Sequence, residues 1–350
     1  MAKLQTLANK TGEVTFRKKL VRQHIGAEIT STGEPDFSEN VREIKSRIEL
    51  TRQMFTSLRH RGLRLSPFLE IAAGEGFRSD LLVTEFGARG FATDISQHTL
   101  AADRVISKEL HLGKRSIKIC CDAYNLPFLS NSFPLIFVAL SLHHFPDPTP
   151  VIAEAVRVLT PTGYFYFDEE PIKQNLNFNL WRRDYHLRWF EKLLKYSIVL
   201  LFLSRIGRAE VDHGILEETF SLSTWAEALA PFAQAEIIQT VYPPSLGIKE
   251  TKIKTNRADW INPKFLVRLG LFLFGGGIGG ICQLQKKGIA QKFKTPADLL
   301  ACPDCRMNDN LAPLKHKFNT LICTRCRKSY YKKKGVWILL EHKLEKQLYG

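Results

Sequence analysis

Four residues in one stretch of the chain have the types and spacing of a nucleotide site. Gly74 and Gly76 follow a short apolar run, and glycines there let the backbone turn tightly and approach a ligand. Glu70 lies four residues before Gly74, and Asp94 ends a second apolar run, where its carboxylate could accept hydrogen bonds from both ribose hydroxyls. Carboxylates beside the turn disfavour a pyrophosphate and favour a cationic ligand. The alternative is a turn whose glycines serve packing alone.

The residues around this turn predict the elements that would hold it. Residues 68–71 are typical of a short strand, residues 81–86 have helical apolar spacing, and residues 90–94 predict a second strand. This is the pattern of a β-α-β unit. The segment EIAAGEG at residues 70–76 resembles motif I, E/D-x-G-x-G-x-G, of class I S-adenosylmethionine-dependent methyltransferases, with Ala72 in place of the first glycine.

The resemblance implies a binding site for S-adenosylmethionine. In this family an acid after the third strand meets the adenine, a role that falls here on Asp122 and Ala123. Taken singly, Asp122 could equally be a turn or cap residue. The residues that the resemblance assigns to the cofactor are Glu70, Ala72, Gly74, Gly76, Asp94, Ile95, Asp122 and Ala123.

The rest of the chain has the element order of an α/β domain. Further strands are predicted over residues 116–121, 133–142, 164–167, 235–242 and 279–284, and helices over residues 38–65, 98–112, 149–159 and 223–232. With the first two strands, these complete the seven-stranded, doubly wound, Rossmann-like sheet that the resemblance implies.

Four titratable residues follow the predicted fourth and fifth strands. His143 and His144 come directly after the apolar run at residues 133–142, and Glu169 and Glu170 end the aromatic fifth strand. Ligands of open α/β sheets bind beyond the carboxyl ends of the strands, so we expect all four side chains beside the acceptor. A histidine could act as general base. The alternatives are structural histidines and solvated acids.

Four cysteines predict a metal site near the C-terminus. Cys302, Cys305, Cys323 and Cys326 have the spacing C-x2-C-x17-C-x2-C, which is typical of a structural zinc ion held by four thiolates. Disulfides are the alternative. Residues 295–340 resemble a family of small zinc-ribbon proteins, some of which bind and activate methyltransferases that act on tRNA, rRNA or translation release factors.

These patterns divide the chain into a large domain and a small one. We expect a mobile arm over residues 1–37, a methyltransferase domain over residues 38–287, a linker over residues 288–296 and a zinc-ribbon domain over residues 297–350. Within the large domain, residues 172–221 mix arginines with aromatic residues and are interpreted as a substrate lid; an extra helical pair is the alternative.

Charge is distributed unevenly along the chain. The formal net charge is +15, yet residues 67–170 hold 8 basic against 13 acidic side chains, whereas residues 286–350 hold 15 against 5. The basic tail suits RNA or an anionic membrane surface, or is simply a solvated face. No secretory pattern opens the chain and no apolar stretch is long enough to span a bilayer, so we expect a cytoplasmic protein with peripheral membrane contact as an option.

The function predicted from these features is S-adenosylmethionine-dependent methyl transfer to an oxygen or carbon of a small molecule, glycan or lipid intermediate. Enzymes of the resembled family that methylate exocyclic or amide nitrogens often carry Asn/Asp-Pro-Pro-Tyr after the fourth strand, and residues 141–144 read SLHH instead. One alternative is an RNA or translation-factor methyltransferase. The other is a non-catalytic module that binds RNA or protein.

Overall fold

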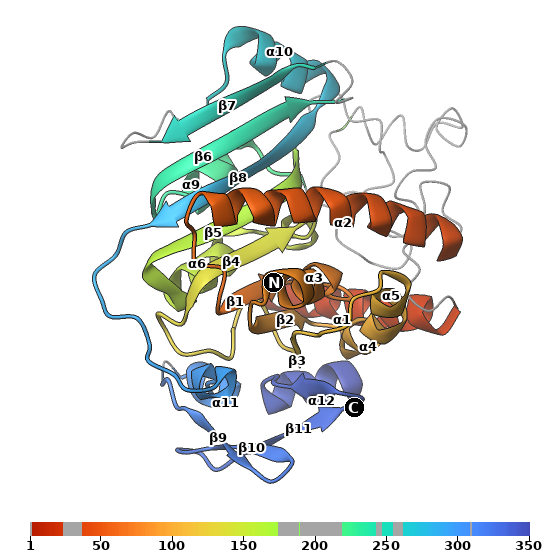
Figure 1. The fold of residues 1–350 in the computed structure, drawn as a ribbon, viewed down its shortest axis with the longest axis vertical. Helices are drawn as coiled ribbons and strands as arrows, with labels where there is room; N and C mark the ends of the chain where they lie inside the picture. The colour runs from red at the N-terminus through yellow and green to blue at the C-terminus, as the bar shows by residue number, and fades with distance from the viewer. Residues whose placement is uncertain are drawn as a thin grey trace.

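The computed structural model describes residues 2–23, 37–173, 189, 219–242, 247–254, 262–308 and 310–350. Most of the predicted lid, residues 174–188 and 190–218, lies outside these ranges. The described chain folds around one mixed sheet with helices on both faces (Figure 1). No helix among the described residues is long and apolar enough to cross a membrane.

The parallel half of the sheet contains the strands that carry the predicted site. Its order is β3-β2-β1-β4-β5, so β1 lies between β2 and β4, and the chain changes direction across the sheet at this point. Ligands of open α/β sheets bind at such a switch point. The five strands are β1 Phe68–Ile71, β2 Gly90–Asp94, β3 Ile117–Cys120, β4 Phe133–Ala139 and β5 Leu159–Ile172.

Three antiparallel strands continue the sheet beyond β5. β8 pairs with both β5 and β6, and β7 pairs with the outer side of β6. Because β5 and β6 are both antiparallel to β8, β6 runs in the same direction as the parallel strands. These strands are β6 Phe232–Val241, β7 Lys249–Lys254 and β8 Gly276–Leu284.

Helices cover both faces of the sheet and bury its apolar side chains. On one face Phe55 of α2 meets Phe137 of β4 edge to face, and on the other Trp225 of α9 stacks on Phe167 of β5. Alternate residues of a strand point to opposite faces, so the continuous apolar run of β4 is buried on both sides. The helices of this layer are α2 Phe37–His60, α3 Phe77–Phe86, α4 Gln97–Ala101, α5 Asp103–Glu109, α6 Thr149–Val158, α9 Leu222–Ala228 and α10 Phe265–Phe274.

The sheet is larger than the seven strands predicted from the sequence. β7 extends one edge, and β12 of the C-terminal segment pairs in parallel with β3 at the other, so that the described residues form a sheet of 12 strands. An edge strand leaves backbone groups unpaired, and β12 satisfies those of β3. The C-terminal elements are η6 Pro296–Leu299, α11 Pro303–Arg306, β9 Leu314–Lys317, β10 Thr320–Cys323, β11 Ser329–Lys333, β12 Val336–Ile338 and α12 His342–Tyr349.

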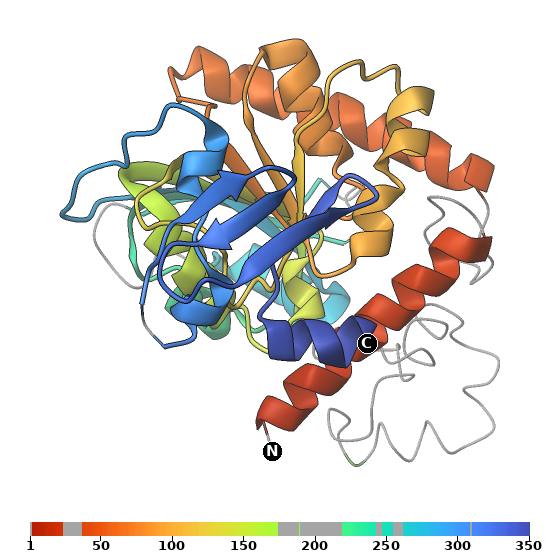
Figure 2. The ribbon, with the colours of Figure 1, turned by 90° about the horizontal axis from the view of Figure 1, so that it is seen from below.

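The N-terminal residues differ from the predicted mobile arm. Residues Ala2–Gln23 form helix α1, which lies beside α4 and α12 (Figure 2). Val14 and Phe16 of this helix are buried. They are two residues apart rather than three or four, so the sequence shows no apolar stripe of helical period, and the pattern analysis therefore missed the helix.

Candidate functional site

The turn between β1 and α3 has an unusual backbone at three of its residues. Ala72, Gly74 and Gly76 all have positive φ, at 52°, 58° and 77°. A side chain in this region costs about 1 kcal/mol, which explains why glycine is expected at each of these positions and why Ala72 is the strained one. At Gly76 a Cβ would also collide with the Nζ of Lys118. A side chain at position 76 would therefore be strained by its φ and would displace the ammonium of Lys118.

Lys118 of β3 supports this turn, and the sequence analysis did not select it. Its buried ammonium donates to the carbonyl oxygens of Glu75 and Gly76, both at 3.2 Å, and to the carboxylate of Asp80 at 3.0 Å. Asp80 is buried as well and accepts from Ser116. The available signal was a lysine in the middle of an otherwise apolar strand, because a buried charge needs a partner.

Glu70 faces the protein rather than the solvent. Its carboxylate is buried and accepts from the backbone N–H and the hydroxyl of Ser79, at 3.1 and 2.5 Å. Burial raises the pKa of Glu70 to about 7. These contacts join the end of β1 to the first turn of α3, so in this structure Glu70 stabilises the glycine turn between them.

Asp94 lies directly beside the glycine turn. One carboxylate oxygen accepts from the N–H of Gly74 at 3.0 Å and the other from the N–H of Ser96 at 2.8 Å. Burial raises the pKa of Asp94 to about 6. Ile95 follows at the start of the loop that leads to α4.

Asp122 lies at the end of the neighbouring strand. The N–H of Cys121 donates to the carbonyl of Asp94 at 2.9 Å, which brings the ends of β2 and β3 together. Asp122 accepts from the N–H of Tyr124 at 3.1 Å, and the next residue, Ala123, is half-buried against the core. The structure thus brings the motif I turn, Asp94 and Asp122 to one edge of the sheet.

Helix α1 contributes charged side chains to this edge. Lys10 forms an ion pair with Asp122, and Glu13 accepts from Arg17 at 2.8 Å. Burial alone would raise the pKa of Glu13, but the positive charges of Arg17 and the nearby imidazole of His144 hold it below its usual value. The helix therefore lies across the ends of the strands, where its basic side chains meet the predicted cofactor acids.

A histidine and a glutamate form a pair at the ends of β4 and β5. The buried carboxylate of Glu170 accepts from the backbone N–H groups of Ser141, Leu142 and His143, at 2.8, 2.9 and 3.1 Å, and contacts Nδ1 of His143 at 2.9 Å. Burial would raise the pKa of Glu170, yet these hydrogen bonds lower it below its usual value. Glu170 therefore fixes both the turn after β4 and the orientation of the His143 ring.

The other two predicted acceptor residues are His144 and Glu169. The ring of His144 lies 4.2 Å from that of His143, centroid to centroid, so the two imidazoles are adjacent. The side chain of Glu169 lies outside the described residues. Of the four, the described structure gathers His143, His144 and Glu170.

The four predicted metal ligands converge on one point. The Sγ atoms of Cys302, Cys305, Cys323 and Cys326 all lie within 4.8 Å of one another. Cys302 and Cys326 are 3.7 Å apart, as are Cys305 and Cys323, close to the edge of about 3.8 Å expected for a tetrahedron with Zn–S bonds of about 2.3 Å. All four are free thiols rather than disulfides. The geometry fits a closed four-thiolate zinc site.

The C-terminal segment is joined to the candidate cofactor site. Besides the β12–β3 pairing, the hydroxyl of Tyr349 donates to the carbonyl of Ile95 at 2.6 Å and accepts from the N–H of Gln97 at 3.0 Å. On the other side, Arg306 pairs with Glu154 at 2.7 Å. Tyr349 thus holds the loop that follows Asp94.

Replacing Tyr349 by phenylalanine is expected to weaken S-adenosylmethionine binding about threefold to tenfold. The change removes two hydrogen bonds that hold the loop after Asp94, each worth about 1 kcal/mol. Calorimetry measures the affinity, and Tyr331→Phe is the matched control because the Tyr331 hydroxyl contacts Glu345 within the C-terminal segment. Equal affinities for the two variants would contradict a positioning role for Tyr349.

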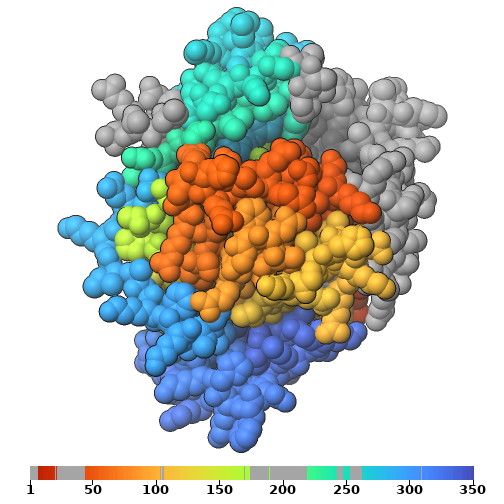
Figure 3. Space-filling view, viewed as in Figure 1, coloured from red at the N-terminus to blue at the C-terminus, as the bar shows by residue number. Residues whose placement is uncertain are grey.

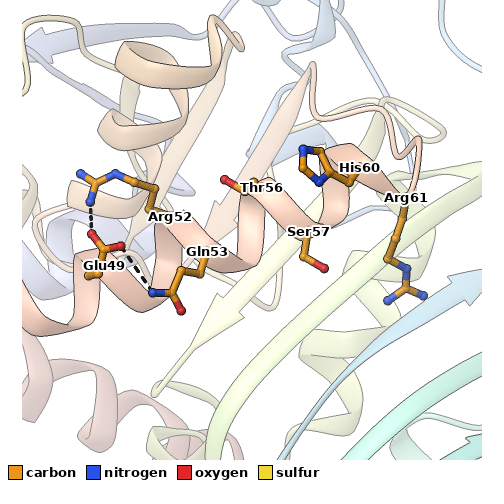
Figure 4. A pocket seen from close by; sticks show the side chains of 7 residues that line it. All are labelled: Glu49, Arg52, Gln53, Thr56, Ser57, His60 and Arg61. Atoms are coloured by element: carbon orange, nitrogen blue, oxygen red, sulfur yellow. Dashed lines mark hydrogen bonds and ion pairs between the residues drawn. The ribbon is translucent and has the colours of Figure 1, made fainter.

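A hollow on the outer surface of α2 has no part in this site. Its lining comes from α2 and the residue after it, and the side chains are polar and mostly directed to solvent (Figure 4). Arg52 in this group pairs with Glu49 and, across the helix layer, with Glu85. We assign it no function.

The strands that carry this site lie mostly within a segment that matches a known protein family. Residues 69–167 match the model of the family described as "Methyltransferase domain". The chain is 28% identical over 163 residues to the ubiquinone/menaquinone biosynthesis C-methyltransferase of Rickettsia typhi, covering 45% of this chain and 62% of that protein. It is 30% identical over 174 residues to the demethylmenaquinone methyltransferase of Clavibacter sepedonicus, covering 48% and 66%. The chain spans less than two thirds of the length of these curated relatives.

Among known structures, the chain is similar to geranyl diphosphate C-methyltransferase from Streptomyces coelicolor A3(2). The TM-score is 0.46 at 12% sequence identity, and the match covers 79% of this chain and 98% of that one.

Proposed function

We propose that this protein is an S-adenosylmethionine-dependent methyltransferase that acts on a carbon or oxygen of a small molecule or lipid intermediate. The supporting observation is the meeting of Asp94, Asp122 and the left-handed glycine turn at the switch point of the sheet. The match of residues 69–167 to the methyltransferase family covers this same region.

The proposed cofactor contacts follow from the chemistry of these residues. Asp94 would accept hydrogen bonds from the ribose hydroxyls, Asp122 and Ala123 would meet the adenine, and the backbone of Gly74 and Gly76 would lie against the amino acid part. When bound, S-adenosylmethionine supplies a methyl group on a positively charged sulfur. Glu70 is a positioning residue in this proposal, because its carboxylate is occupied by Ser79.

The proposed acceptor side is the pair of His143 and Glu170. Glu170 holds Nδ1 of His143, so the other ring nitrogen, Nε2, would take the proton that the acceptor loses as its new bond to the methyl group forms. The curated relatives are named as C-methyltransferases and demethylmenaquinone methyltransferase, which favours a carbon acceptor on an apolar molecule. His144 and Glu169 remain proposed neighbours of the acceptor.

The proposed organisation keeps a methyltransferase domain over residues 38–287, a linker over residues 288–296 and a zinc ribbon over residues 297–350. Helix α1 is added to the first of these, because Lys10 pairs with Asp122. The zinc ion would be structural, since four thiolates leave no coordination position for water or substrate.

Replacing His143 by glutamine is expected to lower kcat about 100-fold while leaving S-adenosylmethionine affinity unchanged, because general base catalysis is worth at least that factor. Glu170→Gln should lower kcat in the same direction through the misplaced ring. The exposed residue His60 provides the control variant His60→Gln. Full activity of His143→Gln would refute its role as the base.

The experiment for the function itself uses labelled S-adenosylmethionine. The zinc-loaded protein is incubated with the lipid, aqueous and RNA fractions of cells that lack it, and the labelled species are identified by mass spectrometry. Label in a lipid-soluble or small molecule is expected. Label confined to RNA would replace the proposed acceptor class, and no transfer to any fraction would favour a non-catalytic module.

A further inference from the structure

Helix α10 presents large apolar side chains to solvent. Phe265 is 75% exposed and Leu266 73%, and Leu269, Phe272, Leu273 and Phe274 are also exposed. Scattered exposed apolar residues are ordinary, but six on one ten-residue helix form a patch. The helix lies at one end of the molecule, opposite the C-terminal zinc ribbon, and its surface is visible there in the space-filling view (Figure 3).

The packing of α10 leaves this patch outward. Val267, Gly270 and Leu271 are buried, and Gly270 lies so close to Val241 of β6 that an added Cβ would stand 2.8 Å from its side chain. The N–H of Tyr242 donates to the carbonyl of Gly275 at the end of the helix, at 3.1 Å. One stripe of α10 therefore anchors it to the sheet, and the remaining apolar side chains have no role in the core.

The position of this anchor relates the patch to the carboxyl ends of the parallel strands, where His143 and Glu170 lie. β6 runs in the same direction as β4 and β5, so Val241 at its carboxyl end lies on the same side of the sheet as His143 and Glu170. A partner that contacts α10 would therefore lie on the side of the sheet where the strands end, not on the side where they begin.

The charges around the patch are basic. Helix α10 contains no acidic residue and carries the exposed Arg268, while Lys264 precedes it and Lys249 lies exposed on β7. The acid described nearby, Glu250, is paired with Lys252 at 2.8 Å and accepts from the N–H of Lys264. An apolar face rimmed by lysine and arginine is complementary to anionic lipid headgroups above acyl chains.

The patch is smaller than the contact surface of a stable protein interface. The exposed parts of these six side chains, each of roughly 200 Å² when fully exposed, amount to roughly 600 Å² of accessible surface. A stable protein interface buries about 800 Å² on each partner. A bilayer needs no matching surface of that size, because the side chains can insert individually.

We propose that α10 is an interfacial helix that docks the protein on an anionic lipid bilayer, with Phe265, Leu266 and Phe272 entering the headgroup region. Docking through α10 places the carboxyl ends of β4 and β5, with His143 and Glu170, near the membrane, where an apolar acceptor would be dissolved. The delivery of such an acceptor rests on the proposed function, whereas binding to the bilayer does not.

Vesicle sedimentation of the full zinc-loaded chain tests this proposal. Wild type should bind vesicles of phosphatidylcholine with one quarter phosphatidylglycerol, bind pure phosphatidylcholine more weakly, and lose affinity as salt is added. The double variant Phe265→Ser/Leu266→Ser should lower the partition coefficient about 100-fold, because the burial of each such side chain is worth a factor of about ten or more. Arg268→Glu should weaken binding to the anionic vesicles only.

Controls separate this outcome from misfolding and from failure of the proposed enzyme. Phe318→Ser replaces a side chain that is 93% exposed in the zinc ribbon, and it should leave vesicle binding unchanged. Melting temperature and S-adenosylmethionine affinity should be the same for all variants. Equal vesicle binding by wild type and the double variant would overturn the proposal, as would a concentration-dependent dimer that the double variant abolishes, since that would make a second copy the occupant.

Discussion

Replacing Asp94 by alanine is expected to lower the affinity for S-adenosylmethionine about 1000-fold, so that calorimetry detects no binding at ordinary concentrations. Two hydrogen bonds from ribose hydroxyls to a carboxylate contribute about 2 kcal/mol each, and their sum of about 4 kcal/mol corresponds to three orders of magnitude. The carboxylate also accepts from Gly74 and Ser96, so its loss would loosen the turn as well.

Two controls define what the Asp94 result means. Glu49→Ala removes an exposed acid of α2 and should leave the affinity unchanged. Asp94→Asn keeps the shape of the side chain and should recover part of the affinity. Unchanged binding by Asp94→Ala would contradict the assignment of the site.

The raised pKa of Asp94 predicts that S-adenosylmethionine affinity depends on pH in the wild type and depends on it less in Asp94→Asn. Because burial raises this pKa to about 6, the carboxyl group in the unbound protein becomes neutral as pH falls through that value. The ribose hydroxyls need the charged acceptor, so affinity should fall by up to tenfold per pH unit below 6. Asp94→Asn has no charge to lose at this position and should lack that part of the pH dependence, even though Glu70 titrates nearby.

Removing zinc is expected to destabilise the whole chain and to weaken cofactor binding. Structural zinc sites contribute on the order of 10 kcal/mol of apparent binding free energy, and a module of this size has little core of its own. Here the loss would spread, because β12 pairs with β3 and Tyr349 holds the loop after Asp94. Cys305→Ser should bind no zinc, melt at a much lower temperature and bind S-adenosylmethionine at least tenfold more weakly.

Elemental analysis, thermal melting and calorimetry measure these three effects on one preparation. Wild type should carry one zinc ion per chain. Cys282→Ala is the matched control, because Cys282 is a buried cysteine of β8 outside the thiolate cluster. A zinc-free Cys305→Ser protein with the melting temperature and affinity of wild type would contradict the structural role of the metal.

The features that the sequence predicts well are those that depend on residues within one short segment of the chain. The glycine turn, the apolar run of β4 and the paired cysteines each depend on residues close together in the chain, so their spacing carries the information. The structure places Asp94 and Asp122 at adjacent strand ends because the β-α-β order dictates it. His143 and Glu170 meet for the same reason.

The features that the sequence analysis missed depend on contacts between distant residues. Lys10 and Asp122 are 112 positions apart, and Tyr349 and Ile95 are 254 apart. No local pattern records such a pair. The seven predicted strands are all present, but the sheet continues beyond them, because β12 pairs with β3 across more than 200 positions of the chain.

Titration of the full zinc-loaded protein with S-adenosylmethionine tests the central claim most directly. One binding site per chain is predicted, with competition by S-adenosylhomocysteine and none by a nicotinamide dinucleotide. Absence of binding by the wild-type protein, or binding of the dinucleotide in its place, would contradict the proposal that carboxylates at the ends of β2 and β3 hold a sulfonium nucleoside.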